Sequence, residues 1–115
     1  MTERNHNMEQ KMIVAIVRTQ AVEKLEGRLI DMGSQGFSVS EVKGCGEYAN
    51  FFNPDWKVTH ARIEIVAQQS KVDDIVAAIL DSAHTSMTGD GIVAVLPVER
   101  LYRIRTKTEV TADTN

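Results

Sequence analysis

Two groups of residues in this sequence are suited to holding an anion. Residues 88–91 read TGDG, and Gly44 and Gly46 form a second glycine pair. Glycine lets backbone N–H groups approach a ligand without a Cβ in the way, and successive N–H groups in a tight turn form an anion-binding nest. Arg103 and Arg105 are spaced so that both guanidinium groups would point the same way on a strand, ready to bind phosphate. Ordinary turns beside two solvated arginines would show the same pattern, so the residues alone leave both interpretations open.

Asp90 lies between the two glycines of the TGDG turn (residues 88–91) and carries the wrong charge for a phosphate contact. Asp side chains commonly accept hydrogen bonds from the backbone of their own turn. We therefore expect Asp90 to hold the shape of this turn rather than to contact a ligand.

The composition is that of one ordinary globular domain. The chain has 115 residues, of which 43% are apolar and 25% charged, and its net charge is −3. The negative charge argues against a nucleic-acid partner, and no run approaches the roughly 20 apolar residues of a membrane span. The first residues lack the apolar core of a signal peptide, and the single Cys45 excludes an internal disulfide. We expect a cytoplasmic single domain over residues 1–115, ordered over about 11–106.

Apolar periodicity predicts an α+β domain. Strands are expected over 12–18, 37–44, 58–67 and 92–98, with a short strand over 101–105, and helices are expected over 20–33 and from Ser70. The order βαββαβ with a short extra C-terminal strand is the ferredoxin-like plan. Ser70 and Asp73 resemble a capping box, and Gly33 is the expected stop of the first helix.

Each predicted helix has one apolar stripe that can cover a sheet. The stripes consist of Val22, Leu25, Leu29 and Ile30 in the first helix, and of Val72, Ile75, Val76, Ile79, Leu80 and Ala83 in the second. Two helices cover one sheet face, yet the strands over 12–18 and 92–98 are apolar on both faces. We expect other subunits to cover the second face, although the chain's own long loop is an alternative.

Four segments together resemble the PII signal-transduction protein family. They are VSEVKGCG at 39–46, IEIV at 63–66, TGDG at 88–91 and RIRT at 103–106, and the resemblance covers roughly residues 12–106. It implies a homotrimer that binds adenine nucleotides in the clefts between subunits. It also implies regulation of transporters or enzymes through a long loop after the second strand, and no enzymatic activity.

The resemblance assigns nucleotide contacts position by position. Near the nucleoside it places Ile16, Ser38, Gly44, Gly46 and Val66; in the phosphate loop it places Gly89, Asp90 and Gly91; and across the subunit boundary it places Arg103 and Arg105.

Two positions depart from the family pattern at the phosphates. The lysine that typically follows the GDG is here Ile92, and a basic residue usual just before the loop glycine is here Met87. A charged hydrogen bond contributes about 1.5–3 kcal/mol, so the loss of these contacts should weaken mainly the binding of the outer phosphates. We therefore expect ADP or AMP to compete well with ATP, unless Lys107 compensates.

The loop over about 47–57 departs as well. Gly46 is followed by Glu47 and Tyr48, without the family's glutamine that helps to hold magnesium and 2-oxoglutarate. The loop is shorter than usual and holds four of the chain's six aromatic residues, namely Tyr48, Phe51, Phe52 and Trp56. These aromatics would either anchor a partner or fold the loop back onto the body.

The shortened loop is most similar to the carboxysome-associated PII-like branch. That resemblance implies bicarbonate as a co-effector of ADP or AMP, and a membrane transporter or metabolic enzyme of inorganic-carbon metabolism as partner. Lys43, His60 and Arg62 are the candidate bicarbonate ligands by charge and position. Two alternatives stay open: a nitrogen-regulatory PII protein that senses ATP, ADP and 2-oxoglutarate, and a partner-binding module without nucleotide.

Metal and catalytic sites are not expected. His6, His60 and His84 lack metal-ligand spacing, and Cys45 has no ligand nearby in the sequence. No nucleophile elbow is present, so we expect neither a metal cofactor nor an enzyme.

Overall fold

The computed structural model describes residues 9–34, 36–42 and 59–111. Its elements follow in the order β1 (Gln10–Arg18), a 3-10 turn (Thr19–Ala21), α1 (Val22–Asp31), β2 (Phe37–Val42), β3 (His60–Gln68), α2 (Gln69–Ala83), β4 (Gly91–Pro97), β5 (Tyr102–Arg103) and β6 (Thr108–Glu109). The order from β1 to β4 is the predicted βαββαβ. Within the described residues, no helix is long and apolar enough to cross a membrane.

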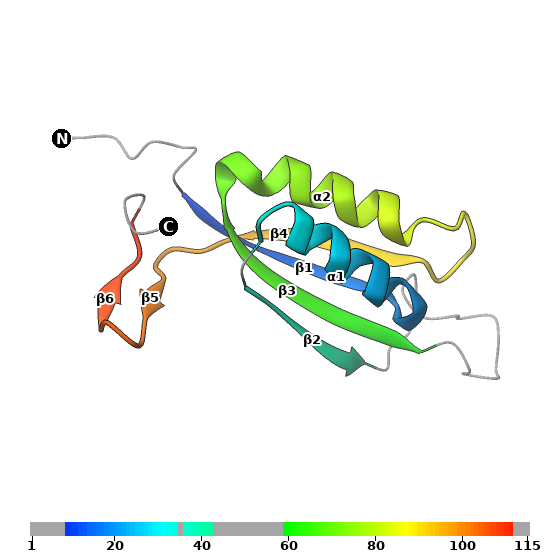
Figure 1. The fold of residues 1–115 in the computed structure, drawn as a ribbon, viewed down its shortest axis with the longest axis horizontal. Helices are drawn as coiled ribbons and strands as arrows, with labels where there is room; N and C mark the ends of the chain where they lie inside the picture. Colours follow the sequence, from blue (N-terminus) through cyan, green and yellow to red (C-terminus); the bar gives the residue numbers. More distant parts are fainter. Residues whose placement is uncertain (1–8, 35, 43–58, 112–115) are drawn as a thin grey trace.

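The four long strands form one antiparallel sheet in the order β2-β3-β1-β4. Ile13 of β1 lies opposite Ile65 of β3 and Val95 of β4, so β1 is paired on both sides. Figure 1 shows α1 and α2 side by side on the same face of this sheet. The arrangement confirms the predicted ferredoxin-like fold.

The hydrophobic core lies between the helices and the sheet. Its buried side chains come from alternate strand positions and from one stripe of each helix: Ile13, Ala15, Val17, Leu25, Leu29, Ile63, Ile65, Val72, Ile75 and Ile79. Burying a large aliphatic side chain contributes about 1.5–3 kcal/mol. Three of these residues belong to β1, so the core fixes this strand and with it the position of Arg18 at its end.

α1 ends at Gly33 as predicted. Gly33 has a φ of +85°, its N–H donates to the Ile30 carbonyl at 2.9 Å, and the Ser34 N–H donates to the Leu29 carbonyl at 3.0 Å. This pair of hydrogen bonds is the Schellman motif that ends a helix. The predicted apolar stripe is wrong at Ile30, which is exposed because it is turned by about 100° from the buried Leu29.

The start of α2 differs from the prediction. The helix begins at Gln69, and no side chain caps it, so Ser70 and Asp73 do not form the expected capping box. The reason is that a backbone group takes the place of a cap, since the Gln69 N–H donates to the Glu9 carbonyl at 2.7 Å. Leu80 was assigned to the buried stripe but is exposed.

The C-terminal segment also differs. β5 ends at Arg103 and pairs with β6 in a separate two-stranded sheet, which Figure 1 shows apart from the main sheet. Arg105 lies in the turn between these strands, where the Lys107 N–H donates to the Ile104 carbonyl at 3.2 Å. The predicted short C-terminal strand is present, but it covers only Tyr102–Arg103 of the expected 101–105, so Arg105 does not share a strand face with Arg103.

The sheet face away from the helices carries exposed apolar side chains. Ile92 and Leu96 of β4 are 40% and 43% exposed, and they lie beside Ile16 and Met12 of β1. No described residue of the chain covers this strip. Contiguous apolar surface of this kind marks an interface. We therefore still expect further copies of the chain to cover it.

Leu96→Glu tests this expectation, because it places a charge where an interface would exclude water. Ile30→Glu is the matched control, since Ile30 is an exposed apolar residue on the helix side. Light scattering after size exclusion should give a smaller species for Leu96→Glu and the wild-type oligomer for Ile30→Glu. A monomeric wild type, or an unchanged mass for Leu96→Glu, would count against an interface on this face.

Candidate functional site

The carboxylate of Asp90 organises the turn between α2 and β4. It accepts hydrogen bonds from the backbone N–H groups of Thr85 at 2.7 Å and Ser86 at 3.0 Å, and also from the Thr85 hydroxyl. The Arg18 Nε adds an ion pair at 3.3 Å. Asp90 thus holds its own turn, as predicted from the sequence.

These contacts keep Asp90 ionised. Burial raises the pKa of the Asp90 carboxyl, but the hydrogen bonds from Thr85, Arg18 and Ser86 outweigh it and lower the pKa from 3.8 to about 2. A carboxyl whose pKa is lower in the folded protein stabilises the fold above its unfolded pKa of about 4. This contribution is lost as the pH falls from about 4 towards 2.

Two further side chains bind the backbone of the TGDG turn. The Arg18 Nη2 donates to the Thr88 carbonyl at 2.7 Å, and the His60 Nε2 lies 2.8 Å from the Gly89 carbonyl. Arg18 and His60 are both buried and face each other across β1 and β3. The proposed bicarbonate role of His60 stays a prediction, with its Nε2 already bonded to the turn; Arg62, two residues further on β3, bonds Glu64 at 3.0 Å.

Gly91 is the point of closest approach between β4 and β1. Its φ is +117°, and a Cβ built on it would lie 1.8 Å from the Ile16 carbonyl oxygen. No other residue fits this position without moving the strands apart. Ile16, predicted to lie near the nucleoside, therefore contacts the end of the turn through its backbone.

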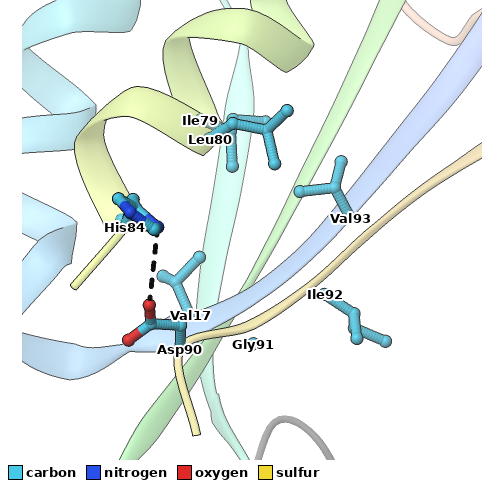
Figure 2. Close-up of a pocket in the computed structure, with 9 residues that line it drawn as sticks. Val17, Ile79, Leu80, His84, Asp90, Gly91, Ile92 and Val93 are labelled. Carbon is cyan, nitrogen blue, oxygen red and sulfur yellow. Dashed lines mark ion pairs between the residues drawn. The ribbon is translucent and has the colours of Figure 1, made fainter. Parts of the chain in front are cut away.

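A cavity of about 200 Å³ lies beside the turn, between α2 and β4. Figure 2 shows its mostly apolar wall, which is lined by Val17, Ile79, Leu80, Ala83, Ile92 and Val93, with His84 and Asp90. In Figure 2 the Ile92 side chain points away from Ile79, Leu80 and Val93, because successive residues of β4 face opposite sides of the sheet and Ile92 lies on the side of Ile16. At the position where the family pattern has a lysine, the chain thus carries a neutral side chain on the sheet face away from the helices.

Ser86, His84 and Asp90 lie together without forming a catalytic relay. The Ser86 Oγ is 3.0 Å from His84 Nε2, but His84 Nδ1 is 3.9 Å from Asp90 Oδ2, which is the ion pair dashed in Figure 2. That distance exceeds a hydrogen bond, and Asp90 is engaged by Thr85 and Arg18. His84 is also exposed, so nothing fixes its ring for proton transfer.

Arg103 lies at the opposite end of the sheet from the TGDG turn. It lines a cavity of about 650 Å³ together with Gly36 and Val66. Val66 pairs with Met12 near the start of β1, whereas Gly91 pairs with Val17 near its end. A strand rises about 3.3 Å per residue, so these two positions, five residues apart on β1, are separated by roughly 17 Å. Val66 therefore lies far from Gly91 within one chain, and its contact with the nucleoside stays a prediction.

The remaining predicted residues divide into two sets. Ser38 is exposed on β2 opposite Glu64, between the two ends of the sheet. Outside the described residues lie Lys43, Gly44, Gly46, Tyr48, Phe51, Phe52 and Trp56, and with them the loop over 47–57. Sequence reasoning missed Arg18 as a partner of the turn. Its signal was a basic residue at the end of an otherwise apolar strand, where burial requires a partner.

The family of the chain follows from comparison with known proteins. The family described as nitrogen regulatory protein P-II matches residues 10–108. The chain belongs to this family. The nitrogen regulatory protein P-II of Azospirillum brasilense is 35% identical over 108 residues, which cover 84% of this chain and 92% of that protein. The nitrogen regulatory protein P-II 2 of Methanothermobacter thermautotrophicus is 34% identical over 103 residues, which cover 84% and 90%.

Arabidopsis thaliana provides a relative and a solved structure. Its P-II homolog is 31% identical over 102 residues, which cover 82% of this chain but 52% of the homolog, so this chain spans about half of that protein's length. The crystal structure of Arabidopsis PII bound to citrate matches with a TM-score of 0.75 and 30% identity over 90% of each chain. The predicted family and fold are confirmed, and the chain is a regulatory protein of the P-II family. Its placement in the carboxysome-associated branch stays a prediction.

Gly91→Ala should destabilise the fold. The new methyl group meets the Ile16 carbonyl, and the positive φ strains any residue with a Cβ, so the free energy of unfolding should fall by more than about 2 kcal/mol. Gly27→Ala within α1 is the control, because nothing lies within 4 Å of its added Cβ and alanine favours helix by about 0.5–1 kcal/mol. Urea denaturation measures both. Similar stability for the two variants would contradict the close approach.

Asp90→Asn should lower the free energy of unfolding by about 1–3 kcal/mol at pH 7, because the charged hydrogen bonds are lost. The difference from wild type should shrink as the pH falls from about 4 towards 2, between the unfolded and the folded pKa of the carboxyl. Asp81→Asn is the control, since Asp81 bonds Arg28 at 2.8 Å on the exposed helix surface, and its free energy of unfolding should stay close to that of wild type. The midpoints of urea denaturation across this pH range measure the difference. A loss of stability that does not depend on pH would refute the role of the ionised carboxylate.

Proposed function

We propose that this P-II protein binds an adenine nucleotide at a cleft between two copies of the chain, and that ADP or AMP binds at least as well as ATP. One copy supplies the TGDG turn and the neighbouring copy supplies Arg103 and Arg105. The proposal rests on one observation: the turn and Arg103 lie at opposite ends of the sheet, so one chain holds only half of a phosphate site.

The turn is suited to a phosphate group by its backbone. Gly89 and Gly91 have φ angles of +96° and +117°, and neither carries a side chain that would keep a ligand away from the N–H groups. The guanidinium of Arg103 is permanently charged and matches phosphate geometry. Its exposed position on β5 leaves it available to a second copy.

The low charge around the turn favours fewer phosphates. Arg18 is already paired with Asp90, while Met87 and Ile92 are neutral. Attraction to an anion then comes mainly from short-range N–H dipoles and from the neighbour's arginines. A third phosphate would gain little from such a site, which supports ADP or AMP as the ligand.

The regulatory step that we propose is a change of the loop over 47–57 with nucleotide occupancy in a homotrimer. The loop would engage a membrane transporter or a metabolic enzyme of inorganic-carbon metabolism. Bicarbonate is the proposed co-effector, with Lys43, His60 and Arg62 as its candidate ligands. Occupancy regulates the partner only if the nucleotide binds the two loop states with different affinity.

A nitrogen-regulatory function with 2-oxoglutarate as co-effector is the second candidate. It is favoured by the names of the relatives, all of which are nitrogen regulatory proteins. The citrate in the Arabidopsis structure shows that this relative holds a polycarboxylate. The two candidates differ in the anion that should strengthen nucleotide binding.

Calorimetric titration of ADP, AMP and ATP separates them, each with and without bicarbonate or 2-oxoglutarate. We expect ADP or AMP to bind, bicarbonate to strengthen the binding, and 2-oxoglutarate to have no effect. If 2-oxoglutarate instead strengthened the binding of ATP, the result would favour the nitrogen-regulatory function. Replacing both Arg103 and Arg105 with alanine should weaken binding at least tenfold, about 1.4 kcal/mol, while the oligomer persists. Unchanged affinity in this double variant would remove the arginines from the site.

A further inference from the structure

The TGDG turn is attached to the sheet by two side chains from one rung of the β1–β3 ladder. Arg18 and His60 are direct cross-strand partners. Each contacts a different carbonyl of the turn: Arg18 binds that of Thr88 at 2.7 Å, and His60 that of Gly89 at 2.8 Å. Only 8% of Arg18 and 3% of His60 are exposed, so these bonds are shielded from water.

A carbonyl that is held in place also orients the next N–H. The peptide unit is planar and trans, so an N–H points away from the carbonyl before it. Arg18 thereby directs the Gly89 N–H away from its own guanidinium. His60 directs the Asp90 N–H in the same way, and this group donates to the Met87 carbonyl at 3.3 Å. Because a carbonyl oxygen only accepts, the His60 proton must be on Nε2.

We infer that Arg18 and His60 are positioning residues that hold the TGDG turn in its anion-binding form before the ligand arrives. The inference rests on the proposed nucleotide function, which it extends by naming the groups that prepare the site. A turn held in advance loses less conformational freedom on binding, and so binds more tightly without any added contact. Neither side chain needs to touch the nucleotide.

The planar geometry of the Arg18 guanidinium matters more for holding the turn than its charge does. Its Nε pairs with Asp90 while its Nη2 binds the Thr88 carbonyl, so one planar group joins a side chain and a carbonyl of the same turn. A lysine keeps the charge but cannot make both bonds in this geometry. Glutamine in place of His60 retains an N–H donor, whereas leucine removes it. These three substitutions therefore distinguish the effect of orientation from the effects of charge and of packing.

The experiment compares adenosine and AMP binding by calorimetry. Arg18→Lys and His60→Leu should each weaken the affinity for AMP about tenfold. The affinity for adenosine should change less than about twofold, because only the phosphate group contacts the turn. His60→Gln should stay within about threefold of wild type for AMP. Arg28→Lys is the matched control, since Arg28 bonds Asp81 on the exposed helix surface, and it should match wild type.

Two results would overturn the inference. Equal weakening of adenosine and AMP would indicate a general structural role, and unchanged AMP binding in both Arg18→Lys and His60→Leu would show that the anchors are dispensable. Amide hydrogen exchange in the ligand-free protein tests the same point without nucleotide. The Asp90 amide should exchange at least about fivefold faster in His60→Leu, while the Ser34 amide, bonded to Leu29, stays unchanged.

The two measurements separate this inference from the proposed function. A wild type that binds neither adenosine, AMP nor ADP would refute the nucleotide function. In that case the exchange experiment, carried out on both Arg18→Lys and His60→Leu, would decide whether these side chains hold the turn, and unchanged exchange at Asp90 in both variants would refute it.

Discussion

The position of the candidate site depends on how closely β4 approaches β1 at Gly91. A Cβ at this residue would lie 1.8 Å from the Ile16 carbonyl, so the pairing of the two strands requires glycine where the turn ends. This close contact holds the turn against the end of β1. Arg18, the last residue of β1, lies two residues after Ile16. Core packing holds β1 through Ile13 and Val17, so the rigidity of the core extends to the turn.

The carboxylate of Asp90 is engaged on both oxygens by groups of its own turn and by Arg18. The oxygens of Asp90 are occupied by Thr85, Ser86 and Arg18, and the guanidinium balances the charge. In the proposed site, the ligand would meet mainly the N–H dipoles of the turn, whose attraction falls off within a short distance. Recognition of this type depends on geometry more than on net charge. It therefore depends on whatever fixes the carbonyls of the turn.

The architecture could be predicted from the sequence because its two main signals, the pattern of apolar residues and the helix-ending glycine, depend on neighbouring residues alone. Short apolar runs, some of them alternating with polar residues, identified the four strands, and Gly33 identified the end of α1. The errors arose where tertiary contacts replaced a local signal. The Glu9 carbonyl took the place of a cap at Ser70, and a chain reversal at 104–107 shortened the strand expected over 101–105 to Tyr102–Arg103.

The candidate site could be predicted only in part from the sequence. The role of Asp90 followed from turn chemistry, because its partners are four and five residues away. Arg18 and His60 could not be assigned to the turn from the sequence, because they lie 70 and 29 residues from the carbonyls that they bind. Contacts at such separations depend on strand register, which becomes known only with the fold.

A site divided between copies of a chain would couple ligand binding to assembly. In the proposed arrangement, Gly89 and Arg103 meet only when two copies are in contact, so a nucleotide binds the assembled form and not the single chain. A ligand that binds one form stabilises it by RT ln(1 + [L]/Kd), which is about 2.7 kcal/mol at a concentration of 100 Kd. The same linkage requires that any partner or anion that changes the packing of the copies also changes nucleotide affinity by an equal factor. Since the apolar strip on β4 and β1 and the TGDG turn share the same strands, a shift between copies would reach the phosphate site through the backbone itself.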